Sequence, residues 1–238
     1  MDTRVHIVIM DIAAAPAEGE LLPQLHAEEQ ARYRGFSREA RRRSWLAGRA
    51  LLLAALARVS GPVDSTALRT AESGGVRYGD DRLHLSLSHS RGLIGAALAP
   101  VPVGLDLEWP RHRLAVDQSE RVYTGSEAAQ LQALSPAERQ DAFYALWTLK
   151  EAACKVMGFK LWQGLRYARF DLAAGRFWPE APFPGGAWTC LHARLGDGPR
   201  LALAVRDGGP VELECLRLAA PQAWNKETLV QPAWVYAR

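Results

Sequence analysis

The chain has 238 residues, of which 48% are hydrophobic and 23% are charged, and this composition excludes a disordered, collagen-like or coiled-coil chain. The formal net charge of +3 shows that the molecule as a whole is not a polycation. No apolar run approaches the roughly 20 residues of a membrane helix, so we expect no membrane segment. The cysteines, Cys154, Cys190 and Cys215, are too far apart for a disulfide framework or a zinc motif, which predicts a reducing, cytoplasmic location.

The first half of the chain combines a helical region with short strands. Residues 5–10 are rich in Val, Ile and Met, which predicts a buried strand. Residues 26–58 have a helical pattern, which Gly61-Pro62 ends. Alternating or apolar patterns then predict three strands at 84–88, 93–99 and 103–108. A helix with an antiparallel meander forms a compact α+β lobe.

The second half repeats this order of elements. A helix is expected from Ser126 to Leu134. Ser135 as cap, Pro136 at the first helical position and Glu138 at the third predict a second helix that runs to about residue 157. Strands are expected at 167–172, 188–193, 201–206 and 211–218. The similar order permits two related lobes, and about 100–150 residues is the usual domain size.

Two carboxylates share one strand. Residues two apart on a strand point to the same face, so Asp106 and Glu108 lie together while Leu105 and Leu107 face the core. An oxygen-only ligand set suits a hard cation such as Mg²⁺. The spacing is equally that of a solvated strand face with two acids, and the strand by itself leaves both interpretations open.

Three further segments carry polar groups that suit anions. Glu151 and Lys155 form a helical i,i+4 pair, whose simplest role is a surface salt bridge. Lys150 falls on an apolar stripe, where a lysine either extends its amine to solvent or holds an anion. Ser88-His89-Ser90 ends a strand, where it binds a phosphate or makes local turn hydrogen bonds. The arginine-rich run at 32–49 is a solvated helix face, a nucleic-acid surface or a grip on a phosphorylated ligand.

Taken in order, these segments resemble the motifs of a known family. Residues 103–108 and 147–155 are similar to the two signature motifs of the surfactin-type (Sfp-type) 4′-phosphopantetheinyl transferases. Residues 87–90 resemble the Ser-His block of that family. Arg32 and Phe36, ahead of residues 45–49, are similar to its N-terminal region that contacts coenzyme A (CoA). The resemblance spans about residues 28–160.

The resemblance implies a fold, a reaction and partners. The family has an α+β fold of two similar lobes related by a pseudo-twofold axis, here 1–102 and 103–238, with the active site in the cleft between them. It transfers the 4′-phosphopantetheine arm of CoA to a serine of an apo acyl or peptidyl carrier protein of fatty acid, polyketide or nonribosomal peptide synthesis. Adenosine 3′,5′-bisphosphate is released. We expect a Mg²⁺-dependent, cytoplasmic monomer that binds no nucleic acid and no membrane.

The resemblance also implies roles for single residues. Asp106, Glu108 and Glu151 would hold Mg²⁺ on the CoA pyrophosphate. Glu151 would also accept the serine proton, with Lys155 and Lys150 beside the pyrophosphate. The remaining CoA contacts would come from Arg32, Ser88 and His89, with Arg77 in place of a family lysine. Glu29 stands where the family often has a basic residue, so Arg43 or Arg49 would complete the grip on the 3′-phosphate.

Two other functions fit the same residues. A Mg²⁺-dependent nuclease would use the acids together with the arginine run, although Trp109-Pro110 follows the carboxylate pair where such an enzyme has a lysine. A non-catalytic module that binds a carrier protein or RNA would leave the acids dispersed. Incubation with an apo carrier, CoA and Mg²⁺ separates these alternatives.

Overall fold

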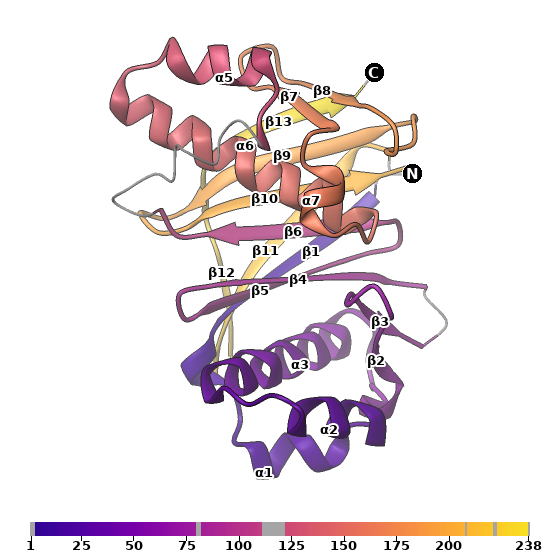
Figure 1. Cartoon of the computed structure of the whole chain (residues 1–238). Helices are drawn as coiled ribbons and strands as arrows, with labels where there is room; N and C mark the ends of the chain where they lie inside the picture. The colour runs from indigo at the N-terminus through magenta and orange to yellow at the C-terminus, as the bar shows by residue number, and fades with distance from the viewer. Residues whose placement is uncertain (1–2, 80–81, 111–121, 208, 221–222, 238) are drawn as a thin grey trace.

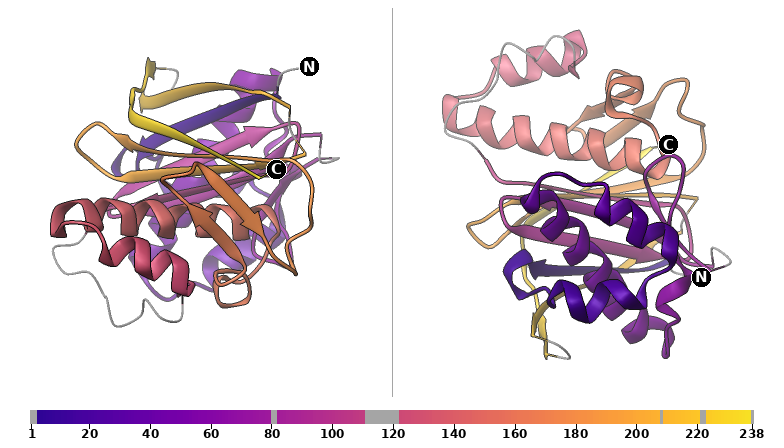
Figure 2. Two further views of the ribbon diagram at one scale, coloured as in Figure 1. Left: turned by 90° about the horizontal axis from the view of Figure 1, so that it is seen from above. Right: turned by 60° about the horizontal axis from the view of Figure 1, so that its bottom comes forward.

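Two β-sheets stacked between two helices form the body of the protein. The computed structural model describes residues 3–79, 82–110, 122–207, 209–220 and 223–237. Helix α3 (Glu39–Ser60) covers the outer face of one sheet, and helix α6 (Pro136–Val156) covers the outer face of the other (Figures 1 and 2). This is the α+β architecture that the sequence predicts, and the described elements confirm it.

The first sheet has the strand order β12-β11-β1-β5-β4. Its strands come from both ends of the chain: β1 (Thr3–Asp11), β4 (His84–Ser90), β5 (Leu93–Ala99), β11 (Val211–Ala220) and β12 (Ala223–Lys226). Strand β1 pairs in parallel with β11 and antiparallel with β5. Strands β11 and β12 therefore join the sheet of the N-terminal half, although the expected division at 102/103 assigns them to the other lobe.

The second sheet has the order β6-β10-β9-β13-β8-β7. Its strands are β6 (Val103–Glu108), β7 (Ala168–Asp171), β8 (Arg176–Pro179), β9 (Trp188–Leu195), β10 (Arg200–Arg206) and β13 (Leu229–Ala237). Strand β6 pairs with β10 and not with β5. The expected meander of three strands is therefore wrong at its third member, because β6 opens the second sheet.

The remaining elements surround these layers. They are the helices α1 (Glu18–Leu21), α2 (Ala27–Arg34), α5 (Gly125–Gln132) and α7 (Leu161–Gly164), and the strands β2 (Leu68–Thr70) and β3 (Val76–Tyr78). The helical pattern at 26–58 is two helices, α2 and α3, because the chain leaves helical geometry after Gly35. Helix α6 begins with the predicted capping box of Ser135 and Glu138.

Apolar side chains fill three interfaces between the layers. On β1, Ile7 and Ile9 pack between the two sheets, while Val8 and Met10 pack against α3. Both faces of the strand are buried there, which explains why residues 7–10 form a continuous apolar run. Leu105 and Leu107 also lie between the sheets, as strand alternation predicts. In the described part of the chain, no helix is long and apolar enough to cross a membrane.

Strand β6 and helix α6 touch backbone to backbone at Gly104. A Cβ atom on this residue would overlap the carbonyl oxygen of Ala152. We expect Gly104→Ala to lower the free energy of unfolding by about 3 kcal/mol, since neither backbone can yield easily. Gly19→Ala is the matched control, because a Cβ there meets nothing within 4 Å. Its effect should stay within about 1 kcal/mol in urea unfolding. If Gly104→Ala unfolds at the same urea concentration as the wild type, the close contact between β6 and α6 at Gly104 is contradicted.

Candidate active site

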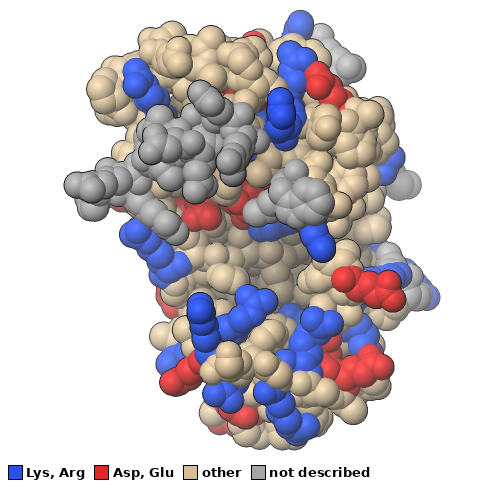
Figure 3. Space-filling model, in the orientation of Figure 1, with Lys and Arg blue, Asp and Glu red and all other residues tan. Residues whose placement is uncertain are grey.

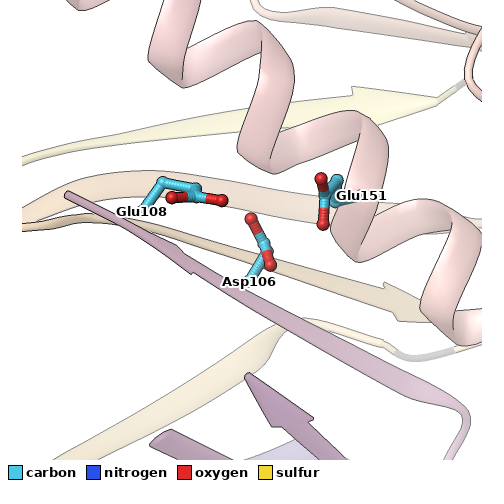
Figure 4. A group of neighbouring side chains, drawn as sticks. All are labelled: Asp106, Glu108 and Glu151. Carbon is cyan, nitrogen blue, oxygen red and sulfur yellow. The ribbon is translucent and has the colours of Figure 1, made fainter. Parts of the chain in front are cut away.

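Three carboxylates meet where β6 passes beneath α6. Asp106 and Glu108 extend from the strand and Glu151 from the helix (Figure 4). One ligand oxygen from each lies within 4.8 Å of the others. Asp106 is 2% exposed and Glu108 is half-buried, so this pair is not a solvated strand face. The structure therefore brings together the three residues that the sequence proposes as metal ligands.

The electrostatics of this group call for a positive partner. Burial and the neighbouring charge of Asp106 raise the pKa of Glu151 to about 8, and Lys155 only partly opposes this. Asp106 Oδ1 accepts from Ser88 Oγ at 2.8 Å and from Lys155 Nζ at 2.7 Å. Its Oδ2 is buried and has no hydrogen-bond donor among the described residues. An unpartnered oxygen in an all-oxygen group of three acids fits a Mg²⁺ ligand set.

A basic cavity of about 590 Å³ lies beside the carboxylates, between the first sheet and the end of α6. Its polar lining includes Arg38 and Arg41 at the start of α3, His89 on β4 and Lys155 on α6. Figure 3 shows a hollow at mid-height of the molecule, with acidic side chains above it and basic side chains on its lower rim. The arrangement suits a phosphorylated ligand, because arginine and lysine bind phosphate oxygens directly.

Lys155 links the cavity to the carboxylates. Its Nζ donates to Leu105 O at 2.9 Å as well as to Asp106 Oδ1. His89 lies on the same side, where desolvation and the charges of Lys155 and Arg41 lower the pKa of its ring. The imidazole is thus neutral at pH 7, and it can donate or accept a hydrogen bond there.

The structure spreads the predicted arginines over different surroundings. Arg49 lines the cavity, but its guanidinium is held by Glu29 Oε2 at 2.7 and 2.9 Å and lies over the ring of Trp45. Glu29, the residue that departs from the family pattern, is thus the buried partner of Arg49. Arg43 lines a different cavity, and Tyr33 lines that cavity too.

Arg32 and Arg77 are exposed and do not line the basic cavity. Burial lowers the pKa of Arg49, and the nearby charge of Arg32 adds to this effect. Burial also lowers the pKa of His84, and the nearby charge of Arg77 adds to it. The predicted roles of these two residues in binding CoA therefore stay proposals.

Lys150 is not brought to the carboxylate group. It is fully buried, and its Nζ lies 2.9 Å from Glu127 Oε1. The same Nζ donates to Leu165 O at 2.9 Å and to Ala168 O at 2.6 Å. The ammonium is therefore surrounded by partners in the core between α5, α6 and β7, away from solvent. Ser88 is also buried, and its hydroxyl faces β6.

Arg38 and Arg41 both line the cavity, although neither is among the site residues predicted from the sequence. The available signal was helical spacing: Arg41, Trp45 and Gly48 follow at i, i+4 and i+7, and all three line the cavity. Gly48 has no side chain to fill that space, and a Cβ there would come within 3.1 Å of Leu87.

Clustered carboxylates beside a basic cavity are chemically suited to a divalent cation and a phosphorylated ligand, and comparison with known proteins identifies the family. The sequence profile of the 4′-phosphopantetheinyl transferase superfamily matches residues 102–204. The 4′-phosphopantetheinyl transferase HetI of Nostoc sp. (strain PCC 7120) is 30% identical over 197 residues, which cover 80% of this chain and 82% of HetI. The chain therefore belongs to the 4′-phosphopantetheinyl transferase superfamily.

Two other relatives match over shorter segments. A 4′-phosphopantetheinyl transferase of Bacillus subtilis is 34% identical over 76 residues, 32% of this chain and 34% of the relative. The 4′-phosphopantetheinyl transferase AcpT of Salmonella typhimurium is 36% identical over 125 residues, 52% of this chain and 62% of AcpT. The chain thus spans less than two thirds of the length of these two. The superfamily is confirmed. The surfactin-type subdivision stays a prediction, since HetI and AcpT are as similar to this chain as the Bacillus subtilis relative is.

Proposed function

We propose that this protein transfers the 4′-phosphopantetheine arm of CoA to a serine hydroxyl of an apo carrier protein, as a surfactin-type enzyme acting as a monomer in the cytoplasm. Adenosine 3′,5′-bisphosphate is the leaving product. The observation that carries the proposal is the cluster of Asp106, Glu108 and Glu151 at the edge of a basic cavity. The names of the relatives agree with this activity.

Asp106, Glu108 and Glu151 would hold Mg²⁺, with the unpartnered Oδ2 of Asp106 as one ligand atom. The bound ion would supply charge neutralisation for the CoA pyrophosphate. Arg38, Arg41 and His89 line the cavity and bind the remaining phosphate oxygens of CoA. Lys155 Nζ holds Asp106 Oδ1 at 2.7 Å, and its positive charge lies where the carboxylate cluster meets the basic cavity.

In the reaction, the serine oxygen forms a bond to the phosphorus that carries the pantetheine arm. The bond from that phosphorus to the oxygen bridging the two phosphates breaks, and the negative charge leaves on adenosine 3′,5′-bisphosphate. Glu151 accepts the serine proton, a role that suits a carboxylate one helical turn from Lys155, which lines the basic cavity. Such a transfer depends on positioning and charge stabilisation more than on covalent catalysis by the protein.

Mass spectrometry tests the proposal directly. The protein is incubated with a panel of apo acyl and peptidyl carrier proteins, CoA and Mg²⁺, and a parallel set contains EDTA. We expect at least one carrier to gain the mass of one phosphopantetheine arm, and the gain to disappear with EDTA. Failure to modify any carrier, together with Mg²⁺-dependent cleavage of DNA or RNA, would refute the proposal and favour the nuclease.

A further inference from the structure

Serine side chains connect β4 and β6, which are edge strands of different sheets. On an edge strand, every second backbone N–H points away from its own sheet. In β6 and just beyond it, these N–H groups are met by hydroxyl oxygens of β4. Ser86 accepts from Leu105 N at 2.9 Å, Ser88 from Leu107 N at 3.1 Å and Ser90 from Trp109 N at 3.1 Å. All three serines are buried.

Two of these serines also bind the carboxylates. Ser88 Oγ donates to Asp106 Oδ1 at 2.8 Å, and Ser90 Oγ donates to Glu108 Oε2 at 3.1 Å. A hydroxyl group has one proton to donate. The hydrogen bond that each serine oxygen accepts from a backbone N–H fixes the position of that oxygen. The hydroxyl proton then points to the carboxylate one residue earlier in the chain. Ser86 makes the same contact to an N–H, but the residue before Leu105 is Gly104, which has no side chain.

We propose that Ser88 and Ser90 are positioning residues that orient the metal-binding carboxylates. Each hydroxyl holds one oxygen of a carboxylate, and at Asp106 the other oxygen stays open to the cation. At Asp106 this division is visible: Oδ1 takes both protein donors, and the buried Oδ2 takes none among the described residues. The inference rests on the proposed function, and it gives Ser88 a task at the metal site rather than at the CoA phosphate.

The test measures cation affinity, with Mn²⁺ as the probe. Binding of Mn²⁺ is followed by electron paramagnetic resonance with CoA at saturation, for the wild type and for Ser86→Ala, Ser88→Ala and Ser90→Ala. We expect the Kd for Mn²⁺ to rise about tenfold or more in Ser88→Ala and Ser90→Ala, the usual effect of removing a group that orients a metal ligand. Ser86→Ala should stay within about twofold of the wild type, since the residue before Leu105 is Gly104 and offers no carboxylate for the hydroxyl to orient.

Stability measurements separate orientation of the carboxylates from loss of strand contact. Each alanine variant removes the partner of one backbone N–H, so all three should lower the melting temperature by similar amounts. Ser88→Thr keeps a hydroxyl and should restore the Kd of the wild type. The proposal is overturned if Ser88→Ala and Ser90→Ala bind Mn²⁺ normally, or if Ser86→Ala weakens binding as much as they do.

The experiment also distinguishes failure of the inference from failure of the proposed function. A wild-type protein that binds no Mn²⁺ removes the metal site, and both proposals fall with it. If the wild type binds Mn²⁺ but modifies no carrier protein, the transfer proposal fails while the comparison of the serine variants still decides the inference.

Discussion

Replacement of Glu151 by glutamine is expected to abolish transfer and, at the same time, to stabilise the metal-free protein. The substitution removes one of three clustered carboxylates and the proposed proton acceptor. A bound metal supplies several kcal/mol of charge stabilisation, so transfer should fall about a thousandfold or more. Without the metal, burial and the charge of Asp106 force folded Glu151 to keep a proton that the unfolded chain releases near pH 7, and glutamine does not carry this cost.

The stabilising effect should depend on pH in a defined direction. The pKa of Glu151 is raised from 4.5 to about 8 in the folded protein. Between these values the folded state keeps a proton that the unfolded state releases, so the metal-free wild type loses stability as pH rises through this interval. Glu151→Gln does not titrate there, and its advantage should therefore grow from pH 5 to pH 8.

Differential scanning calorimetry in EDTA and in Mg²⁺ measures this result. A relief of about 2 kcal/mol would raise the melting temperature by about 4–8 °C in a protein of this size. Addition of Mg²⁺ should stabilise the wild type and leave Glu151→Gln unchanged. Glu20→Gln, at an exposed glutamate of α1, is the matched control and should behave as the wild type. A lower melting temperature for metal-free Glu151→Gln, or transfer close to the wild-type rate, would contradict the assignment.

The second large effect concerns the buried pair of Lys150 and Glu127. Both side chains are 0% exposed, and burial lowers the pKa of Lys150 while the charge of Glu127 opposes this. Glu127 also accepts from the N–H groups of Thr124 and Phe170 at 2.8 and 2.9 Å. The pair thereby connects α5, α6 and β7. Lys150→Met should lower the free energy of unfolding by about 3–5 kcal/mol, because it leaves a buried carboxylate without its counter-ion.

A double-mutant cycle in urea separates this structural role from a role in chemistry. Glu127→Gln alone should also destabilise, and the double variant should cost about 1–3 kcal/mol less than the sum of the single ones. Lys160→Met is the control, because Lys160 is exposed, and it should change stability by no more than about 0.5 kcal/mol. If Lys150→Met unfolds at the wild-type midpoint but fails to transfer, Lys150 acts in the reaction, as the family resemblance implied.

The local part of the site could be predicted from the sequence. Strand alternation alone places Asp106 and Glu108 on one face and Leu105 on the other, and the capping residues locate the start of the helix that carries Glu151. The resemblance to the family motifs then implies that strand and helix face one another, which the cluster of carboxylates confirms. These features depend on residues a few positions apart, where the periods of strand and helix apply directly.

Other parts depend on contacts that no local pattern encodes. The apolar stripe of α6 identified Lys150 as unusual, but its partner Glu127 lies on a different helix. Two interpretations were open for that lysine, solvent or an anion, and the structure shows an anion within the protein itself, the buried carboxylate of Glu127. In the same way, the alternation at residues 84–88 predicted a half-buried strand, which the structure extends to Ser90. That their hydroxyls face another sheet follows only from the tertiary arrangement.

The pairing of β1 with β11 has a consequence for the order in which the protein can be assembled. Thr3 and Val211 are partners in this parallel pair. The central strand β1 therefore has only one of its two neighbouring strands, β5, until residues 211–220 have been synthesised. Contacts so distant in sequence form late and slow folding. A ribosome-bound chain that ends at residue 206 would contain the cavity-lining and carboxylate residues but would leave one edge of β1 open. Strand β13 follows β11 and β12 and belongs to the second sheet, so both sheets need strands that lie beyond residue 206, and neither can be completed before the other half of the chain has been synthesised.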